Sequence, residues 1–322
     1  MSDTSVLPNK LPPELSAWID HQFDQSLIDG RWEVRRLFHG RSKVIESLQA
    51  IVIDWLPPVA VIRLYDDVET SMLEQLVALL AAKDAVQAVL VQERGRKRDT
   101  KFSIPYGEVS EVMQVTESGL IYQIEPLQFQ NFGLFLDMRN GRNWLRAQAQ
   151  GANVLNLFSY TCAFSVAAIA GGAKSVVNVD VSKRALTIGR KNHQLNHQDK
   201  GASQFMPYDM LKSWSRIKKP GPYDIVVIDP PSFQPGSFIA ERDYCKVLRR
   251  LSQLTTANAT VMLCHNDPEQ SSQFIKTLMA EQCSEFVFEQ HLAVPEDFAE
   301  QDREKSVKVL IYKRAAPQLS AY

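Results

Sequence analysis

NVLNLFSYTCAFSVAAIAGGAKSVVNVD, residues 153–180, has the pattern of a strand, a turn, a helix and a second strand. The apolar run at 154–157 is typical of a strand that is buried on both faces. Small and polar residues follow, and then an alanine-rich helix that Gly171 and Gly172 are expected to end in the left-handed conformation. The second strand ends in Asp180. The stretch therefore predicts the beginning of a nucleotide-type parallel sheet.

The acid that ends the second strand, Asp180, indicates the kind of cofactor. A carboxylate at this place can accept hydrogen bonds from a ribose, while the preceding turn surrounds the rest of a nucleotide-like cofactor. A dinucleotide site would need the G-x-G-x-x-G pattern so that the backbone could approach a pyrophosphate, and this turn contains no glycine. S-adenosylmethionine carries no phosphate, so larger residues fit around it. The turn favours S-adenosylmethionine, and an ordinary strand with a chance terminal acid is the alternative that stays open.

A second motif, YDIVVIDPPSF at residues 223–233, predicts the acceptor site. An apolar strand ends in Asp229, and the two prolines that follow hold a rigid loop. The acid and nearby carbonyl groups can hold the edge of a planar base, and the Phe233 ring can stack on its face. This is what a methyltransferase acting on an amino group or a ring atom needs. We predict Asp229, Pro230 and Phe233 as catalytic residues.

Residues from about 36 to 313 resemble a known family. The matching stretches are RLFHGR at 36–41, IDWLPPV at 53–59, GLFLDMR at 133–139, NLFSYTCAFSVAA at 156–168, VNVDVSKRAL at 177–186 and IDPPSF at 228–233. They look like the bacterial class I S-adenosylmethionine-dependent methyltransferases related to those that methylate cytosine C5 and guanine in large-subunit ribosomal RNA. The resemblance implies an α/β fold: a Rossmann-like domain with a seven-stranded, mostly parallel sheet and an antiparallel last strand, behind a small α+β domain.

We place the domain boundary just after a hairpin predicted around Ser118-Gly119. The expected domains are residues 1–126, an α+β domain and candidate RNA-binding platform, and residues 127–322, the methyltransferase domain. In the first domain the pattern predicts a helix that Gly30 ends, two strands and a helix between them.

Composition bounds the class of protein. The 322 residues are 45% hydrophobic and 23% charged with a formal net charge of -1, so a chain that is basic all over is excluded and a nucleic-acid surface must be a local patch. No apolar run approaches the roughly 20 residues that span a bilayer, and the first ten residues lack a signal-peptide core. The four cysteines show no C-x-x-C spacing, so we expect no metal site, reduced thiols and a cytoplasmic location.

Two basic segments are candidate RNA contacts. Residues 31–43 hold five positive charges and one negative, with Trp32, Phe38 and His39 among them. Residues 93–101, ERGRKRDTK, hold five positive charges and two negative. Basic and aromatic residues together suit an RNA backbone and unstacked bases, although solvated surface loops have the same composition.

The two motifs and their neighbours give the predicted cofactor-binding residues. Asp209, shortly after the third strand, is expected to meet the adenine amino group and Met210 to pack on the ring, with a helix-capping acid as the alternative for Asp209. The resemblance implies that Asp137 and Arg139 lie beside the cofactor, with a structural salt bridge as the alternative for Arg139. The full set is Asp137, Arg139, Asn156, Phe158, Ser159, Tyr160, Thr161, Asp180, Val181, Ser182, Asp209, Met210 and Asp229.

Cys264 is a further catalytic candidate because it ends the fifth predicted strand. In the related cytosine C5 enzymes a cysteine at about this place attacks C6 of the ring. This sequence has L-C-H-N-D, whereas those enzymes tend to have a serine on each side of the cysteine. A buried structural cysteine is the alternative, and transfer to a guanine or adenine nitrogen then needs no nucleophile. His265 is a candidate base or an incidental loop histidine.

These patterns predict a cytoplasmic S-adenosylmethionine-dependent methyltransferase that acts on a base of RNA, ribosomal RNA above all. A small-molecule or protein methyltransferase is the first alternative. A non-catalytic RNA-binding or ribosome-assembly protein that retains the fold is the second. The RNA species, the methylated atom and the oligomeric state are left open by the sequence.

Overall fold

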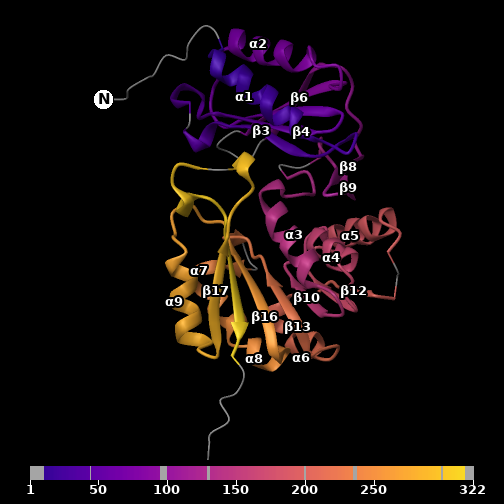
Figure 1. Cartoon of the computed structure of the whole chain (residues 1–322), viewed down its shortest axis with the longest axis vertical. Helices are drawn as coiled ribbons and strands as arrows, with labels where there is room; N and C mark the ends of the chain where they lie inside the picture. The colour runs from indigo at the N-terminus through magenta and orange to yellow at the C-terminus, as the bar shows by residue number, and fades with distance from the viewer. Residues whose placement is uncertain are drawn as a thin grey trace, which may run out of the picture. The chain divides into compact units, whose positions relative to one another are not determined.

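The computed structural model describes residues 11–43, 45–94, 100–128, 131–198, 201–234, 238–298 and 300–315 (Figure 1). The chain divides into two compact units. The first comprises Met1–Leu136 with Pro295–Arg303, and the second comprises Asp137–Val294 with Glu304–Tyr322. The sequence predicts the boundary near residue 126. It does not indicate that a later segment, Pro295–Arg303, returns to the first unit.

Residues on both sides of the expected boundary are tied to the first unit by specific contacts. The backbone N–H of Glu125 donates to the carbonyl oxygen of Phe132 over 2.8 Å, and the Arg63 guanidinium lies 4.2 Å from the centre of the Phe132 ring. In the returning segment, Asp297 accepts a hydrogen bond of 2.9 Å from the backbone N–H of Arg36. These contacts explain why both stretches belong to the first unit.

A five-stranded sheet forms the centre of the first unit, with the strand order β3-β4-β5-β6-β7. All neighbouring strands are antiparallel except β5 and β6, which are parallel and joined through α2. A short β1-β2 pair and the β8-β9 hairpin complete the unit. The bounds are α1 Pro13–Asp24, β1 Leu27–Ile28, β2 Arg31–Trp32, β3 Arg35–His39, β4 Ile51–Leu56, β5 Val59–Leu64, α2 Thr70–Ala81, β6 Ala88–Arg94, β7 Thr100–Tyr106, β8 Met113–Glu117 and β9 Leu120–Ile124.

The two faces of this sheet differ in polarity because side chains alternate along each strand. One face packs against α1 and α2, with Ile19, Ile62 and Met72 in a shared hydrophobic cluster. The other face carries buried polar groups, among them Asp54 and Gln92. The hairpin turn lies at Ser118-Gly119 as predicted, with both residues in the left-handed region. α1 ends at Asp24, before the Gly30 that is expected to end it, because the chain turns into β1.

The second unit is built on a seven-stranded sheet with the order β12-β11-β10-β13-β16-β18-β17. The strands from β12 to β16 are parallel, and β18 is antiparallel to both of its neighbours. The predicted mostly parallel sheet with an antiparallel last strand is therefore confirmed. The bounds are β10 Asn153–Leu157, β11 Ser175–Val179, β12 Ser203–Met206, β13 Tyr223–Ile228, β16 Thr255–His265, β17 Phe286–Leu292 and β18 Lys308–Arg314.

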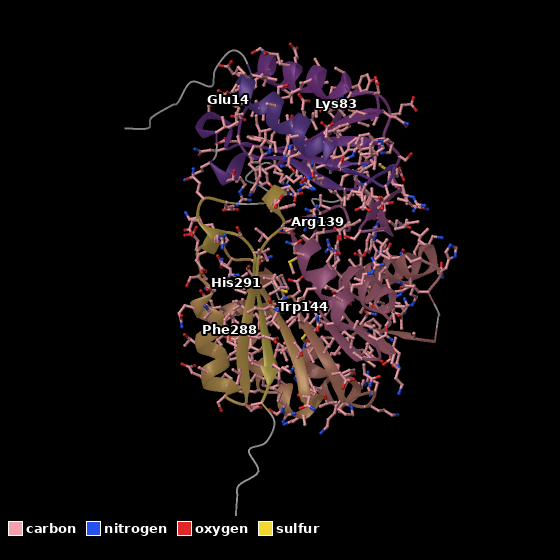
Figure 2. All side chains as sticks on the ribbon, viewed as in Figure 1. Glu14, Lys83, Arg139, Trp144, Phe288 and His291 are labelled. Atoms are coloured by element: carbon pink, nitrogen blue, oxygen red, sulfur yellow. The ribbon has the colours of Figure 1, made fainter. Side chains whose placement is uncertain are left out.

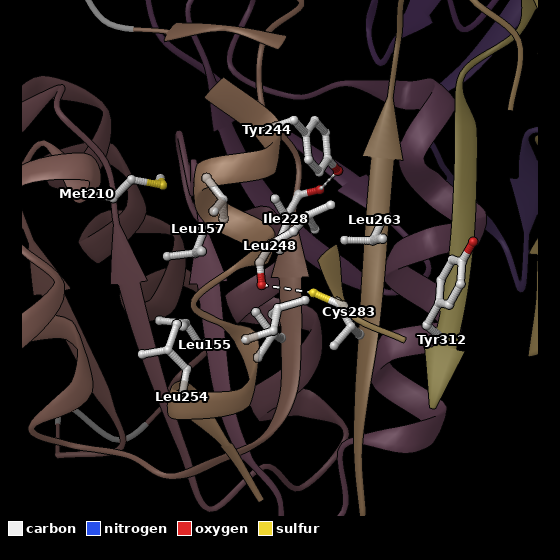
Figure 3. Packing of buried hydrophobic residues seen from close by; sticks show 14 of the residues in the cluster. Leu155, Leu157, Met210, Ile228, Tyr244, Leu248, Leu254, Leu263, Cys283 and Tyr312 are labelled. Carbon is white, nitrogen blue, oxygen red and sulfur yellow. Dashed lines mark hydrogen bonds between the residues drawn. The ribbon is translucent and has the colours of Figure 1, made fainter. Parts of the chain in front are cut away.

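Helices cover both faces of this sheet (Figure 1). Leu155 and Leu157 of β10 pack with residues of α7 and α9, and Figure 3 shows part of this cluster. Val154 points to the opposite face and packs with residues of α3 and α4. The helix bounds are α3 Arg139–Gln148, α4 Ala163–Ala170, α5 Lys183–Leu195, α6 Trp214–Lys218, α7 Ala240–Leu248, α8 Leu251–Leu254 and α9 Gln273–Gln282.

Two local expectations in this unit need correction. The sequence pattern of residues 243–254 predicts one helix, but the structure has two helices here, α7 and α8. Gly172 is left-handed, with φ of 85°, but Gly171 is not, with φ of -85°. Gly171 is instead required by a close approach, since a Cβ atom there would lie 2.0 Å from the carbonyl oxygen of Arg146.

Candidate active site

The turn that follows β10 has an unusual backbone. Phe158, Tyr160 and Cys162 have φ of 57°, 45° and 63°, a left-handed conformation that costs non-glycine residues of order 1–3 kcal/mol each. The surroundings hold the turn in place. The backbone N–H of Ser159 donates to the carbonyl oxygen of Val179 over 3.1 Å. The Asn192 amide donates to the carbonyl oxygen of Thr161 over 2.9 Å. The turn is therefore fixed in advance of any ligand.

Asp180 connects this turn to the end of β11. Its Oδ2 accepts a hydrogen bond from the backbone N–H of Tyr160, and its Oδ1 accepts one from that of Ser182, each over 2.8 Å. Burial raises the pKa of the carboxyl group, and the two N–H donors act in the opposite direction. Beside it, Val181 exposes 43% of its surface. An acid and an exposed apolar side chain at one strand end match the ribose and the adenine ring of S-adenosylmethionine.

The same contacts make the turn a poor site for a pyrophosphate. The backbone N–H of Tyr160 already binds Asp180, and the side chains of the turn stand where glycines would let a phosphate approach the backbone. The residues present therefore fit a cofactor without phosphate, as the sequence predicts.

Asn156 lies behind the turn. It is 1% exposed, and its amide donates to Oδ1 of Asn178 over 2.9 Å. Asn178 in turn donates to Ser165, whose hydroxyl lies 2.9 Å from Nε2 of His193. Burial lowers the pKa of His193 to about 4, so the ring is neutral within this network. The structure thus gives Asn156 a supporting position in the sheet and does not bring its side chain to the open edge.

The other predicted residues near the turn differ in which of their atoms lie at the edge of the sheet: the side chain or only the backbone. Phe158 is partly buried, and its ring centre lies 4.8 Å from that of Phe238. Ser159 and Thr161 are buried, so only their backbone belongs to the edge. Ser182 caps α5, because its hydroxyl accepts a hydrogen bond of 3.1 Å from the backbone N–H of Ala185.

Asp209 and Met210 differ in accessibility. Oδ1 of Asp209 accepts a hydrogen bond of 3.0 Å from the backbone N–H of Leu211, and its Oδ2 lies 3.1 Å from Nζ of Lys212. The capping role left open by the sequence is thus present. Met210 is 5% exposed and belongs to the core cluster of Leu157 (Figure 3), so its side chain lies in the core.

Gly189 of α5 supports the turn by its lack of a side chain. A Cβ atom at this position would lie 2.4 Å from Sγ of Cys162 and 2.9 Å from its Cβ. We expect Gly189→Ala to lower the free energy of unfolding by about 1–3 kcal/mol, because a packed core must shift to admit the methyl group. The expected cofactor affinity is also lower, since Cys162 ends the turn. Thermal unfolding with and without S-adenosylmethionine measures both effects.

Gly141→Ala is the matched control, since Gly141 also lies within a helix. Its nearest neighbour would be the Phe164 side chain at 3.4 Å, and alanine favours a helix over glycine by about 1 kcal/mol. This variant is expected to keep the stability of the parent or exceed it. Equal destabilisation of both variants would contradict the special role of Gly189.

Asp229 follows β13 at the same edge of the sheet, and Pro230 after it is buried. Burial and, to a smaller extent, the carboxyl group of Asp137 raise the pKa of Asp229 to about 7, although Arg142 acts in the opposite direction. Asp137 and Arg142 therefore lie within electrostatic reach of Asp229. The backbone of Phe233 lies in β14 Phe233–Gln234, whereas its side chain is outside the described structure.

Asp137 and Arg139 lie at the beginning of α3, and both have further interactions within the structure. Figure 2 shows Arg139 at this end of the helix and Trp144 further along it. Because Asp137 helps to raise the pKa of Asp229, we infer that Asp137 lies close to the acceptor motif.

Cys264 has the environment of a structural cysteine. It is 0% exposed and packs with Met138, Phe164 and Met262. Burial raises the pKa of its thiol well above the ordinary range, and the carboxyl groups of Asp229 and Asp137 raise it further. A thiol that stays protonated is a weak nucleophile.

Two contacts that the sequence did not indicate join the acceptor motif to the end of β16. The buried Tyr244 hydroxyl donates to the carbonyl oxygen of Cys264 over 3.1 Å and lies 3.5 Å from that of Ile228. The Ser232 hydroxyl donates to Oδ1 of Asn266. His265, between them, is buried, and burial lowers the pKa of its ring. The loop after β13 and the end of β16 are therefore linked by hydrogen bonds, and the neutral His265 ring is buried beside them.

Two kinds of feature are absent from the described part of the chain. It contains no group of three or more histidine, cysteine or acidic side chains arranged to hold a metal ion. No helix in the same ranges is long and apolar enough to cross a membrane.

Curated proteins similar to this chain are named for ribosomal RNA methylation. The Ribosomal RNA large subunit methyltransferase K/L of Alteromonas mediterranea is 33% identical over 227 residues, which cover 67% of this chain and 31% of that protein. The protein of the same name from Vibrio parahaemolyticus is 35% identical over 190 residues, which cover 58% of this chain and 26% of that protein. The chain thus spans less than a third of the length of these relatives.

Solved structures share the fold. A protein from Streptococcus mutans, described as a candidate S-adenosylmethionine-dependent methyltransferase, superposes with a TM-score of 0.81 at 26% identity, covering 93% of this chain and 80% of that one. A structure with the same TM-score of 0.81 is a candidate methyltransferase complexed with SAH. The complex of aTrm5 with tRNALeu has a TM-score of 0.59 at 14% identity, covers 81% of this chain and 71% of that one, and shares the fold alone.

The family model for S-adenosylmethionine-dependent methyltransferases matches residues 35–313, which is most of the chain. The fold, the glycine-free turn and Asp180 agree with that cofactor. The chain belongs to the family of S-adenosylmethionine-dependent methyltransferases.

Proposed function

We propose that this protein transfers the methyl group of S-adenosylmethionine to a base of RNA, with ribosomal RNA as the substrate. The observation that carries the proposal is the position of Asp229, a carboxyl group with a pKa of about 7 in a rigid Pro-Pro loop at the cofactor edge of the sheet. The names of the curated relatives support the choice of RNA. Action on ribosomal RNA would place the protein in the cytoplasm.

The cofactor supplies an electrophilic methyl group on its sulfonium sulfur. In this chain, Asp180 would accept hydrogen bonds from the ribose hydroxyl groups, and the exposed Val181 side chain would contact the adenine ring. The turn from Phe158 to Cys162 would surround the remainder through its backbone. Since this turn is already fixed by hydrogen bonds, little ordering cost is added on binding.

The proposed acceptor is a nitrogen and not cytosine C5. Methylation at C5 requires a cysteine thiolate to attack the ring, and the buried environment of Cys264 keeps its thiol protonated. An amino or ring nitrogen attacks a methyl sulfonium directly when it is well positioned. The Asp229 carboxylate would accept a hydrogen bond from that nitrogen, orient it, and take up its proton as the nitrogen–methyl bond forms and the methyl–sulfur bond breaks. We therefore propose a guanine nitrogen as the target.

We expect Cys264→Ala to keep kcat for RNA methylation within about threefold of the parent, because a structural cysteine takes no part in nitrogen methylation. The measurement is transfer of labelled methyl groups to ribosomal RNA by the purified variant. A folded Cys264→Ala protein that has lost all activity would instead establish the covalent mechanism and cytosine C5 as the target.

The proposed function is tested with labelled S-adenosylmethionine and ribosomal RNA from a strain that lacks this gene. Nucleoside mass spectrometry of the labelled RNA then identifies the product. A labelled methylguanosine is the expected result. Tight cofactor binding without any label in RNA would exclude an RNA acceptor and favour a protein or small-molecule substrate.

RNA contacts are proposed for the two basic segments, residues 31–43 and 93–101. Both belong to the first unit. Residues 95–99 of the second segment lie outside the described structure.

A further inference from the structure

A cavity of about 410 Å³ lies on the second unit, between the beginning of α6 and the carboxyl-terminal end of α7. This volume is within the range of about 300–1,000 Å³ that is usual for small-molecule sites, so it suits a ligand of nucleotide size. None of the residues that line the cavity is among the predicted cofactor-binding or catalytic residues. Within the described ranges the lining side chains are Leu211, Trp214, Lys246, Arg249 and Arg250.

The apolar wall of the cavity consists of Leu211 and Trp214. Both are half-buried and pack against the core cluster that contains Leu157. Trp214 is the first residue of α6, so its backbone is also held by the helix. A tryptophan that is anchored on the core and still lines an open cavity is a platform on which a planar base can stack. Because the ring is held in place before a ligand arrives, stacking on it costs little ordering.

The guanidinium groups of Arg249 and Arg250, directly after α7, are exposed. Nε of Arg249 donates to Oε1 of Gln282 over 2.6 Å, and Nη1 of Arg250 lies 3.5 Å from Oε1 of Gln253. Both partners are neutral amides. Within the described ranges, neither arginine forms an ion pair or a further side-chain hydrogen bond. Both terminal nitrogens of Arg249, and Nε and Nη2 of Arg250, therefore remain able to donate to an anion.

The acids near the cavity do not neutralise these two arginines. The buried Asp243 carboxylate is shared by two other cations, Lys246 at 2.8 Å and Arg242 at 2.7 Å. Glu281 lies at the end of α9 and Glu285 shortly after it, and neither forms an ion pair with a residue that the structure describes. The rim of the cavity thus keeps a net positive charge.

The two sequence segments that line the cavity are rich in basic residues. Residues 211–219, LKSWSRIKK, contain four basic residues and no acid, and residues 246–250, KVLRR, contain three and no acid. Arg216, Lys218 and Lys219 of the first segment are exposed and lie outside the described lining. Positive charge therefore extends beyond the cavity, as contact with a chain of phosphates requires.

An aromatic platform beside exposed guanidinium groups matches the two parts of a nucleotide. The base would stack on Trp214, and the phosphate would accept hydrogen bonds from Arg249 or Arg250. The basic residues beyond the lining favour a nucleotide within a strand over a free one, because they would meet the neighbouring phosphates. We propose that this cavity binds a nucleotide of the RNA strand, apart from the base that receives the methyl group. The proposal rests on the proposed RNA substrate and adds a contact in the second unit.

The first test is the affinity of the full chain for a fluorescently labelled oligouridylate of about 20 nucleotides, measured by anisotropy over a range of salt concentrations. The double variant Arg249→Gln/Arg250→Gln is expected to bind about three- to tenfold more weakly, with a salt slope reduced by about 0.7, the value for one phosphate contact on a single strand. Lys174→Gln/Lys191→Gln is the matched control. It removes two exposed charges, before β11 and within α5, outside the described lining. Its affinity is expected to change less than about twofold, because distant charges are screened by salt.

The second test separates stacking from diffuse positive charge. Trp214→Leu leaves the net charge unchanged and keeps an apolar anchor, but it is expected to bind about tenfold more weakly because no ring remains for the base. Trp214→Phe keeps a ring and is expected to bind nearly as well as the parent. RNA should also quench part of the fluorescence of the five tryptophans in the parent, and Trp214→Phe should lose that part while it keeps its affinity. Thermal stability and S-adenosylmethionine affinity verify that each variant is folded.

Parent-like RNA affinity in both Arg249→Gln/Arg250→Gln and Trp214→Leu would overturn the proposed site, even if the parent methylates ribosomal RNA. UTP that displaces the labelled RNA at a lower concentration than unlabelled oligouridylate does would overturn the RNA strand as the ligand and assign the cavity to a free nucleotide. The methyl-transfer assay separates the two proposals. Absence of RNA methylation alongside the expected binding losses would remove the proposed function and leave the cavity as an RNA-binding site.

Discussion

Asp229→Asn is expected to lower kcat for RNA methylation by about 10²- to 10⁴-fold, the range for loss of a positioned acid–base group. The proposed carboxylate offers two oxygens to an acceptor nitrogen, and asparagine replaces one of them with a donor amide. Single-turnover transfer of labelled methyl groups measures the effect. S-adenosylmethionine affinity is expected to stay within a few-fold of the parent. A loss confined to cofactor affinity would place Asp229 at the cofactor, the other role that the sequence assigns to it.

The parent should also show a pH dependence that the Asp229→Asn variant lacks. The pKa of Asp229 is raised to about 7 by burial and by Asp137, so the carboxylate is lost as the pH falls through that value. Activity is therefore expected to rise with pH through about 7 and then level off. A profile that is identical in parent and variant would assign the titrating group to another residue.

The thermal stability of Asp229→Asn supplies a control, because the substitution is expected to raise stability while it lowers activity. Because the folded-state pKa of Asp229 lies above that of an unfolded chain, its contribution to stability is greatest below the unfolded pKa and is lost as the pH rises through about 7. Asparagine carries no charge at any of these pH values. Asp229→Asn should therefore unfold at a higher temperature than the parent at pH 8, with a smaller difference at pH 5. Lost activity together with gained stability would show that the variant is folded.

The sequence was sufficient to predict the sheet and the cofactor motif because both depend on local patterns. Apolar runs of strand length ending in acids identify parallel strands, and the chain order places their carboxyl ends together. Asp180 and Asp229 were predicted as site residues in this way, and each directly follows a strand of the sheet. The absence of glycine from the first turn also distinguished the cofactor, and the left-handed Phe158, Tyr160 and Cys162 show how side chains occupy a turn that glycine usually forms.

The features that the sequence missed depend on which face of an element a side chain occupies. Asn156 and Met210 stand near the predicted cofactor in sequence, yet the pleat of β10 turns Asn156 toward Asn178, and Met210 packs into the core. Tyr244 of helix α7 donates a hydrogen bond to the carbonyl oxygen of Cys264 in strand β16. Arg41 and Arg94 come from segments distant in the chain, yet both lie over the ring of Tyr65. No local pattern carries such contacts between segments distant in the chain.

Asp180→Ala is expected to weaken S-adenosylmethionine binding by roughly 1–3 kcal/mol, about 5- to 150-fold in Kd, through loss of charge-assisted hydrogen bonds. Two effects combine in this prediction. The carboxylate would no longer accept from the ribose, and the backbone N–H groups of Tyr160 and Ser182 would lose the acceptor that holds the turn. Isothermal titration calorimetry on the purified protein measures the change.

Asp224→Ala is the matched control for Asp180→Ala. Asp224 lies near the amino end of β13 and accepts hydrogen bonds from the backbone N–H of Asn153 and from Thr256, so its removal loosens the same sheet at the opposite edge. If Asp180 acts through the cofactor, Asp224→Ala lowers stability but leaves S-adenosylmethionine affinity nearly unchanged. Equal losses of affinity in both variants would indicate a general loosening of the sheet. Unchanged affinity in Asp180→Ala would place the cofactor away from the carboxylate that joins the end of β11 to the turn after β10.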